Sequence, residues 1–376
     1  MPLRNVNTKI SKSRMFDCAD LTEFINAVIH ILPFGGASMS RFYVCEYRGV
    51  QFMTKVGFYR KSPPELYDKR RRVTTIPHID AEIRVLKVLK RKFIDANITP
   101  CILELVFDRI CSRVRRLAQN TDDCGKYMLT TWQSESTKHT IMREFCRYAD
   151  MVSADVAFDK CAFLVLERCD ISLSDYLRRN TITTVTCAIV KSIIFLIIYT
   201  LHAIKCVYPG FRHYDLHTNN VMLKFDVSYV FRADRPQFDV YTIDGVDHNV
   251  PYFGITPKII DFGYSVIPEE NIMSSATADI MVMYHRADND LLFLFRWIYI
   301  DLGFNPSSQT EGIDALLDEL DPKQTHLHYH TPYIAKTAGQ VPSYEKMLSS
   351  AAFADYRNSI PAFQVHKRYT PITRKK

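Results

Sequence analysis

The chain has no apolar run long enough to cross a bilayer, no internal repeat and no segment of low complexity. Its most apolar stretch, Ile193–Thr200, is far shorter than the ~20 residues that a membrane helix needs. We therefore expect a helix of the protein core there and no transmembrane segment. The first residues, MPLRNVNTKISKSRMF, lack the apolar stretch of a secretory signal, so we expect none.

The 10 cysteines are scattered, without a C-x-x-C pair and without regular spacing. Zinc sites and disulfide frameworks both show such spacing. The distribution therefore predicts reduced thiols, as in a cytoplasmic protein.

Charge of neither sign dominates, although the formal net charge is +7, with 47% hydrophobic and 24% charged residues. This is ordinary globular composition and argues against wholesale disorder. The basic excess either favours acidic partners, such as a nucleotide, an acidic substrate or an anionic membrane, or is simply a soluble surface. No helix-turn-helix or aromatic–basic RNA motif is evident, so no specific nucleic acid is expected.

The first half of the chain is rich in short β runs. These runs predict four strands: Arg41–Tyr47, Val50–Tyr59, Cys101–Phe107 and Ala162–Glu167. The first two flank Arg48-Gly49 and predict a hairpin. Apolar residues at helical spacing predict helices over 21–29 and 79–94. The polar, basic stretch of about 108–160 is interpreted as an insertion.

The second half is mainly helical. A nearly all-apolar stretch over 183–205 predicts a long buried helix, and Val221–Phe225 predicts a strand. Further helices are expected at 172–179 and around 288–302, 312–320 and 343–353. A β-rich front half and a helical back half predict an α+β fold of two lobes with a cleft between them. The expected parts are an N-terminal extension (1–31), a first lobe (32–168), a second lobe (169–360) and a loose basic tail (361–376).

The most specific pattern is His213-Tyr214-Asp215-Leu216-His217-Thr218-Asn219-Asn220, which is followed at a distance by Asp261-Phe262-Gly263. This ordered pair resembles the H-x-D-x-x-x-x-N catalytic loop and the D-F-G metal loop of eukaryotic-type protein kinases. The resemblance covers about residues 30–300 and implies the two-lobed protein-kinase fold.

The resemblance implies a role for each polar group of the two loops. Asp215 would orient the substrate hydroxyl and accept its proton, and Asn220 would bind Mg²⁺. Asp261 would hold Mg²⁺ against the β- and γ-phosphates of ATP.

In the first half, Lys55 stands where the family keeps the strand lysine that grips the α- and β-phosphates, and Glu82 where it keeps the helix glutamate that holds that lysine. Glu167 and Cys169 match the strand end and hinge that contact adenine through the backbone. Asp290, with Asp288 as the fallback, matches a buried helix aspartate that braces the catalytic loop.

The phosphate-covering loop is the poorest match. The sequence Gly35-Gly36-Ala37-Ser38 stands in place of the family's G-x-G-x-x-G. Small residues let backbone N–H groups approach phosphate oxygens, although an ordinary glycine turn has the same composition.

Three departures from the family pattern matter. Tyr214 replaces the arginine that commonly precedes the catalytic Asp, His217 stands where a lysine contacts the γ-phosphate, and no A-P-E follows Asp261. An Asp-Leu-His variant, together with the stretch Tyr252–Gly263, resembles the kinases of large DNA viruses, such as the poxvirus virion-assembly kinase and its giant-virus relatives.

The resulting prediction is a serine/threonine protein kinase of a large DNA virus that uses ATP and Mg²⁺ on protein substrates. Its expected location is the host cytoplasm and, if packaged, the virion. A small-molecule phosphotransferase is the alternative that His217 and the missing A-P-E favour. A pseudokinase scaffold is disfavoured because all five polar groups are retained: Lys55, Glu82, Asp215, Asn220 and Asp261.

Overall fold

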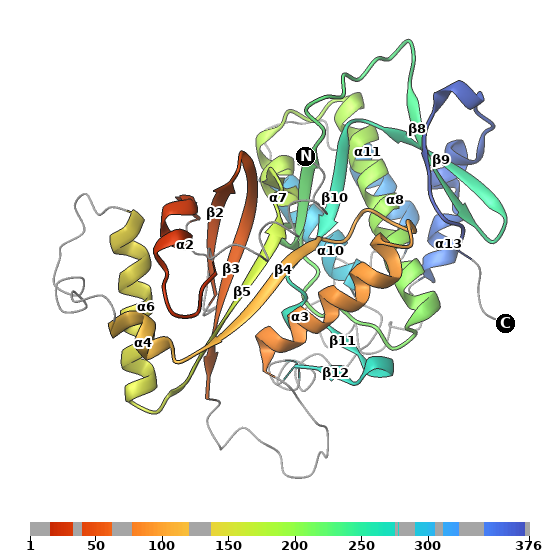
Figure 1. The fold of residues 1–376 in the computed structure, drawn as a ribbon. Coiled ribbons are helices and arrows are strands. Elements are labelled where there is room, and N and C mark those ends of the chain that lie inside the picture. The colour runs from red at the N-terminus through yellow and green to blue at the C-terminus, as the bar shows by residue number, and fades with distance from the viewer. Residues whose placement is uncertain are drawn as a thin grey trace. The chain divides into compact units, whose positions relative to one another are not determined.

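The computed structural model describes residues 16–32, 40–61, 77–119, 137–274, 277, 290–304, 311–322 and 342–372. The chain divides into two compact units (Figure 1). Unit 1 comprises Met1–Ile83 and Glu104–Arg168, and unit 2 comprises Arg84–Leu103 and Cys169–Lys376. The predicted fold class, α+β with a β-rich lobe and a mainly helical lobe, is confirmed by the elements described below. The predicted lobe boundaries stay a prediction.

Unit 1 is built on a five-stranded antiparallel sheet in the order β1-β2-β3-β5-β4. The strands are β1 (Val28–Ile31), β2 (Arg41–Tyr47), β3 (Val50–Arg60), β4 (Leu105–Ser112) and β5 (Ala157–Glu167). The predicted hairpin is confirmed as β2–β3. Its loop residues Arg48 and Gly49 have φ of 53° and 73°, as the two-residue turns that match strand twist require.

Several sequence predictions differ from the helices observed in unit 1. These helices are α2 (Thr22–Ala27), α3 (His78–Leu89, whose end lies in unit 2), α4 (Val114–Gln119) and α6 (Thr137–Ser153). The helix predicted over 79–94 is confirmed, with a final π-helical turn at Lys90–Ile94. The helix predicted over 21–29 ends early, because β1 begins at Val28. The stretch 108–160 contains α4 and α6, and only its two ends belong to the central sheet, as parts of β4 and β5.

Period-two alternation sorts the side chains of this sheet onto two faces. One face packs against α2 and α6 and forms the core of unit 1, with Tyr43, Cys45, Phe52, Val56, Phe163 and Val165 meeting Phe24, Ile141 and Phe145. Figure 1 shows α4 and α6 lying together in this unit. Lys55, in register between these positions, belongs to the opposite face.

A disulfide joins Cys18 to Cys111 in unit 1 (Cα–Cα 5.1 Å). The prediction of reduced thiols is therefore wrong at these positions. The two cysteines are 93 residues apart, and a pairing over that distance leaves no local spacing signal in the sequence.

Unit 2 is organised around α8 (Thr184–Val207), the long apolar helix that the sequence predicts. Its other helices are α7 (Leu173–Arg179), α10 (Asp290–Gly303), α11 (Glu311–Leu320) and α13 (Tyr344–Leu348). By length and composition α8 could cross a membrane, yet 78% of its most apolar window is buried. The helix thus serves as the core helix that was expected.

Short sheets complete unit 2. They are β10-β7-β6, β11-β12 and β13-β8-β9. Their strands are β6 (Ile171–Ser172), β7 (Val221–Phe225), β8 (Gln237–Ile243), β9 (Val246–Tyr252), β10 (Ile255–Ile259), β11 (Val266–Ile267), β12 (Ile272–Met273) and β13 (Val365–Arg368). Strand β7 matches its prediction residue for residue. The helix predicted around 343–353 is instead α13 followed by a 3₁₀ stretch, Ala351–Arg357.

The C-terminal segment is ordered through residue 372, contrary to the prediction of a loose tail over 361–376. Its strand β13 pairs in parallel with β8. Tyr369 stacks on Tyr241 with ring centroids 4.5 Å apart, and Ile372 forms a bridge with Ile243. The buried side chains of Tyr369 and Ile372 thus anchor this segment, although its basic composition predicted a loose tail.

Candidate active site

Lys55 and Glu82 form a buried ion pair in unit 1. The Lys55 Nζ lies 2.9 Å from Glu82 Oε1 and 2.8 Å from Oε2, and each residue is only 2% exposed. Two charges removed from water to this extent are tolerated only when paired and hydrogen-bonded. Neither residue is therefore a solvated surface charge.

A glycine on the same face of β3 lies against the first turn of α3. A Cβ atom at Gly57 would lie 2.5 Å from the Ile79 Cδ1, so the Ile79 side chain would have to shift if a larger residue replaced this glycine. Glu82 lies one turn further along α3. The Phe42 ring, 5.3 Å from Lys55 Nζ, adds a cation–π contact on the ammonium.

The predicted catalytic loop of unit 2, residues 213–220, is anchored by Asp290 at the start of α10. Its two carboxylate oxygens accept the backbone N–H groups of His213 (2.9 Å) and Tyr214 (3.0 Å). Tyr214 has a φ of 65°, which is costly for a non-glycine residue and persists only when neighbours enforce it. The predicted bracing role of Asp290 is confirmed, and Asp288 lies outside the described residues.

Asp215 is held by Asn220 across the loop. The Asn220 Nδ2 donates to the Asp215 backbone O (2.8 Å) and to its Oδ2 (3.1 Å). Burial, reinforced by the charge of Asp261, raises the pKa of Asp215 to about 7. A carboxylate whose pKa lies near the working pH is suited to general-base chemistry.

The metal loop is tied to the catalytic loop within unit 2. The His213 ring accepts the Asp215 N–H at Nδ1 (3.3 Å) and therefore donates from Nε2 to the Ile260 carbonyl (2.9 Å). The Ile260 N–H in turn donates to the Asn220 carbonyl (3.0 Å). The next residue, Asp261, has φ 58° and ψ 60°, so after Tyr214 it is a second strained residue in this region, which the network holds in place.

The residues of these two loops suit Mg²⁺. Because Asn220 spends its amide N–H groups on Asp215, its carbonyl oxygen Oδ1 is left as the metal-binding atom of that side chain. Asp261 supplies a carboxylate. Mg²⁺ in kinase-type sites takes one or two such oxygen groups and completes its shell with phosphates and water. Within the described part of the chain, no cluster of three His, Cys, Asp or Glu side chains offers an all-protein cage.

The structure describes only some of the other predicted site residues. Gly35, Gly36, Ala37 and Ser38 lie outside the described residues. Glu167 ends β5 at 1% exposure, where its Oε1 accepts the Glu104 N–H (2.8 Å). Cys169, in unit 2, is also buried. Their adenine-binding roles stay predictions.

Asp301 is a structural partner of the site that sequence reasoning missed. It is fully buried in α10, where it accepts the Thr218 hydroxyl (2.5 Å) and the Arg178 guanidinium (2.7 Å). It thereby fixes the end of the catalytic loop opposite the Asp290 anchor. The available signal was a single charged residue inside the apolar run WIYIDLG.

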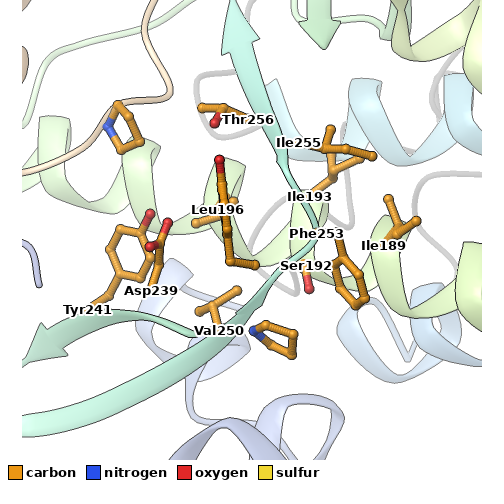
Figure 2. Close-up of a pocket in the computed structure, with 13 residues that line it drawn as sticks. Ile189, Ser192, Ile193, Leu196, Asp239, Tyr241, Val250, Phe253, Ile255 and Thr256 are labelled. Atoms are coloured by element: carbon orange, nitrogen blue, oxygen red, sulfur yellow. The ribbon is translucent and has the colours of Figure 1, made fainter. Parts of the chain in front are cut away.

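A small, partly open hollow lies elsewhere in unit 2 (Figure 2). It is lined by α8 and the strands β8 to β10, including Ile193, Leu196, Val250, Phe253 and Ile255. Its buried Asp239 is already bonded to His366 Nδ1 at 2.7 Å. None of the motif residues lines it, so the catalytic chemistry is not located there.

Comparison with known proteins supports the kinase resemblance. No family model matches the chain. A protein of Acanthamoeba polyphaga mimivirus named "Putative serine/threonine-protein kinase" is 26% identical over 203 residues, which is 50% of this chain and 50% of the relative. The chain thus spans about half the length of the curated relative that it matches. The resemblance to viral members of the protein kinases is confirmed at that level.

A solved structure titled as a kinase domain matches 89% of this chain and 81% of its own, at 14% identity and a TM-score of 0.38. A TM-score of this size is too low to support an assignment by itself.

Proposed function

We propose that the chain is a protein kinase that uses ATP and Mg²⁺ to phosphorylate serine or threonine hydroxyls of proteins. The observation that carries the proposal is the hydrogen-bonded network of unit 2. In it, a pKa-raised Asp215, the amide of Asn220 and the strained Asp261 turn are joined through His213 and Ile260. This network supports the proposal because phosphoryl transfer would need a base and two metal-binding groups on adjoining loops.

In the proposed reaction, Asp215 orients the substrate hydroxyl and accepts its proton. The hydroxyl oxygen forms a bond to the γ-phosphorus while the bond from that phosphorus to the β–γ bridging oxygen breaks, and ADP leaves with the electron pair. Asn220 and Asp261 would hold Mg²⁺, which when bound would supply neutralisation of the phosphate charge. The left-handed turn at Asp261 sets the backbone position from which its carboxylate extends.

Unit 1 would contribute the Lys55 ammonium to the α- and β-phosphates. Glu82 keeps that ammonium pointed in one direction, because both carboxylate oxygens accept from the same Nζ. A lysine fixed in this way loses little conformational entropy when a nucleotide binds.

The name of the mimivirus relative supports serine/threonine specificity and an origin in a large DNA virus. We extend the proposal to action in the host cytoplasm, with packaging into the virion as a further possibility. The Cys18–Cys111 disulfide is uncommon in a reducing cytosol. Non-reducing peptide mapping of the protein from infected cells and from virions would show where the bond persists.

The decisive experiment is transfer of labelled γ-phosphate from ATP and Mg²⁺ to a panel of proteins, with site mapping by mass spectrometry. Asp215→Asn should lower kcat by about 10²–10⁴-fold, because general-base positioning is lost, while ATP affinity stays close to that of the wild type. Equal rates for Asp215→Asn and the wild type would contradict the assignment of the base.

A small-molecule phosphotransferase is the second candidate, which His217 and the missing A-P-E favour. Aminoglycosides and choline in the same assay test it. Labelling of these compounds without labelling of any protein would replace the protein-kinase proposal. Binding of ATP without any transfer would indicate a pseudokinase.

A further inference from the structure

The ring of His217 has a defined hydrogen-bonding state in the structure. His217 precedes the 3₁₀ turn Thr218–Asn220, and its Nδ1 accepts the backbone N–H of Asn219 at 3.2 Å. A nitrogen that accepts a hydrogen bond carries a lone pair, so the ring hydrogen is on Nε2. The loop backbone itself thus selects the tautomer.

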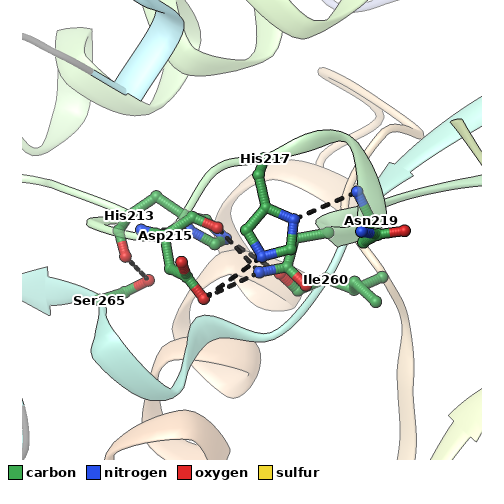
Figure 3. Close-up of polar contacts among 7 residues, drawn as sticks. His213, Asp215, His217, Asn219, Ile260 and Ser265 are labelled. Carbon is green, nitrogen blue, oxygen red and sulfur yellow. Dashed lines mark hydrogen bonds and ion pairs between the residues drawn. The ribbon is translucent and has the colours of Figure 1, made fainter. Parts of the chain in front are cut away.

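The Nε2 of His217 faces the proposed base. It lies 3.7 Å from Asp215 Oδ2, and Figure 3 shows the ring turned toward that carboxylate. This distance is longer than a hydrogen bond. Catalytic hydrogen bonds are often long before substrate binds and shorten in the reacting complex.

Two aromatic side chains of α10 hold the ring in this orientation. The His217 ring centroid lies 5.8 Å from that of Trp297 and 6.1 Å from that of Phe293. The Phe293 and Trp297 rings also meet each other edge to face at 6.3 Å. A helix that is anchored to the same loop through Asp290 therefore also limits the movement of the imidazole.

Two side chains approach the same oxygen of Asp215. Asn220 Nδ2 donates to Oδ2 at 3.1 Å, and His217 Nε2 lies 3.7 Å from it. A second donor that closes on Oδ2 in the reacting complex would fix the carboxylate plane and leave Oδ1 for an incoming hydroxyl.

We propose that His217 is a positioning residue for the phosphoryl transfer, which orients the Asp215 carboxylate through its Nε2–H while Nδ1 caps the following turn. The inference rests on the proposed kinase function. At this position the family keeps a lysine that contacts the γ-phosphate. His217 would instead donate a hydrogen bond to the Asp215 carboxylate.

Two substitutions separate the contributions of the two ring nitrogens. In His217→Asn the side-chain oxygen occupies the place of Nδ1 and keeps the cap, but the donor toward Asp215 is lost. In His217→Gln the amide N–H reaches the place of Nε2 and keeps the donor, but the cap is lost. His30→Ala, at an exposed histidine on β1, is the matched control.

We expect His217→Asn to melt like the wild type but to show a kcat lowered about 10-fold with an unchanged KM for ATP, since orientation of the base is lost and binding is not. His217→Gln should melt at a lower temperature but keep kcat within about threefold of the wild type. The opposite pattern, or full activity in both variants, would overturn the proposal.

Nitrogen-15 NMR of the histidine side chains gives a readout that does not require activity. The proposal expects His217 as the Nε2–H tautomer, with a resonance that shifts in Asp215→Asn, and a His217 found as the Nδ1–H tautomer would overturn it even in an inactive protein. If the wild type transfers no phosphate while the NMR result holds, the kinase proposal fails and the geometric assignment of His217 stands.

Discussion

The two units place their functional groups in different ways. In unit 1, Lys55 and Glu82 stand on a strand and a helix, and one direct ion pair joins them. In unit 2, Asp215, Asn220 and Asp261 stand on loops. Hydrogen bonds of the loop backbone to Asp290, and of the His213 ring to the Ile260 carbonyl, hold these loops in place. Regular elements point side chains by their own period, whereas a loop needs external partners for every strained residue.

This difference has an energetic consequence. The unit 1 arrangement is concentrated in one interaction, so loss of one partner leaves a buried charge alone. The unit 2 arrangement is distributed, so each single loss removes a smaller part of the network.

The largest stability effect is expected at the unit 1 pair. Lys55→Met leaves Glu82 buried without its partner and should lower the free energy of unfolding by about 3–5 kcal/mol. Urea unfolding measures the total loss of stability, and hydrogen exchange of unit 1 peptides shows where in the chain the loss occurs. Lys61→Met, at a more exposed lysine just beyond β3, is the control. The double variant Lys55→Met, Glu82→Leu should recover part of the loss, and no recovery would contradict the ion-pair explanation.

A second test compares a covalent tie with the non-covalent ones. Cys18→Ser opens the link between segments 93 residues apart and should cost about 2–4 kcal/mol, because the unfolded chain regains freedom. Cys187→Ser, at a free and partly exposed cysteine, should change little. Melting curves with and without reductant provide the measurement. A wild type that melts identically in both would mean that the bond does not stabilise unit 1.

Loss of the Asp290 anchor in unit 2 should lower the free energy of unfolding by less than loss of the ion pair or of the disulfide. Asp290→Ala removes the acceptor of two backbone N–H groups and should cost about 2–3 kcal/mol. Because the same bonds hold the Tyr214 turn, kcat should fall as well. Hydrogen exchange should rise in peptides that contain residues 213–220, whereas Glu319→Ala, at an exposed position of α11, should leave them protected. Unchanged protection in Asp290→Ala would contradict the anchoring role.

The smallest effect depends on pH. Burial lowers the pKa of His248 from 6.5 to about 4, so the folded state disfavours the charged ring. The resulting stability is present above pH 6.5 and is lost as pH falls toward 4, with about 2 kcal/mol gone by pH 5.

His248→Leu should flatten this slope in urea titrations between pH 7 and 5. A slope equal to that of the wild type would show that other groups cause the acid sensitivity.

Local pattern was sufficient wherever an element is stabilised by its own period. The strands β2, β3 and β7 and the helix α8 were predicted from alternation or apolar runs within a few residues of their bounds. Strand β13 was missed because its pairing partner β8 is distant in the chain. The strand predicted at Cys101–Phe107 was displaced to Leu105–Ser112 because its register is set by pairing with β5.

The amino-acid order alone determined which chemical groups the protein carries and their sequence along the chain: a strand lysine, a helix glutamate, and two polar loops after a buried helix. Tertiary packing decided which of them are charged, paired or strained. The pKa of Asp215, the buried state of Lys55 and Glu82, and the role of Asp301 depend on contacts between distant segments. Desolvation and hydrogen bonding act through space, and no spacing in the sequence encodes them directly.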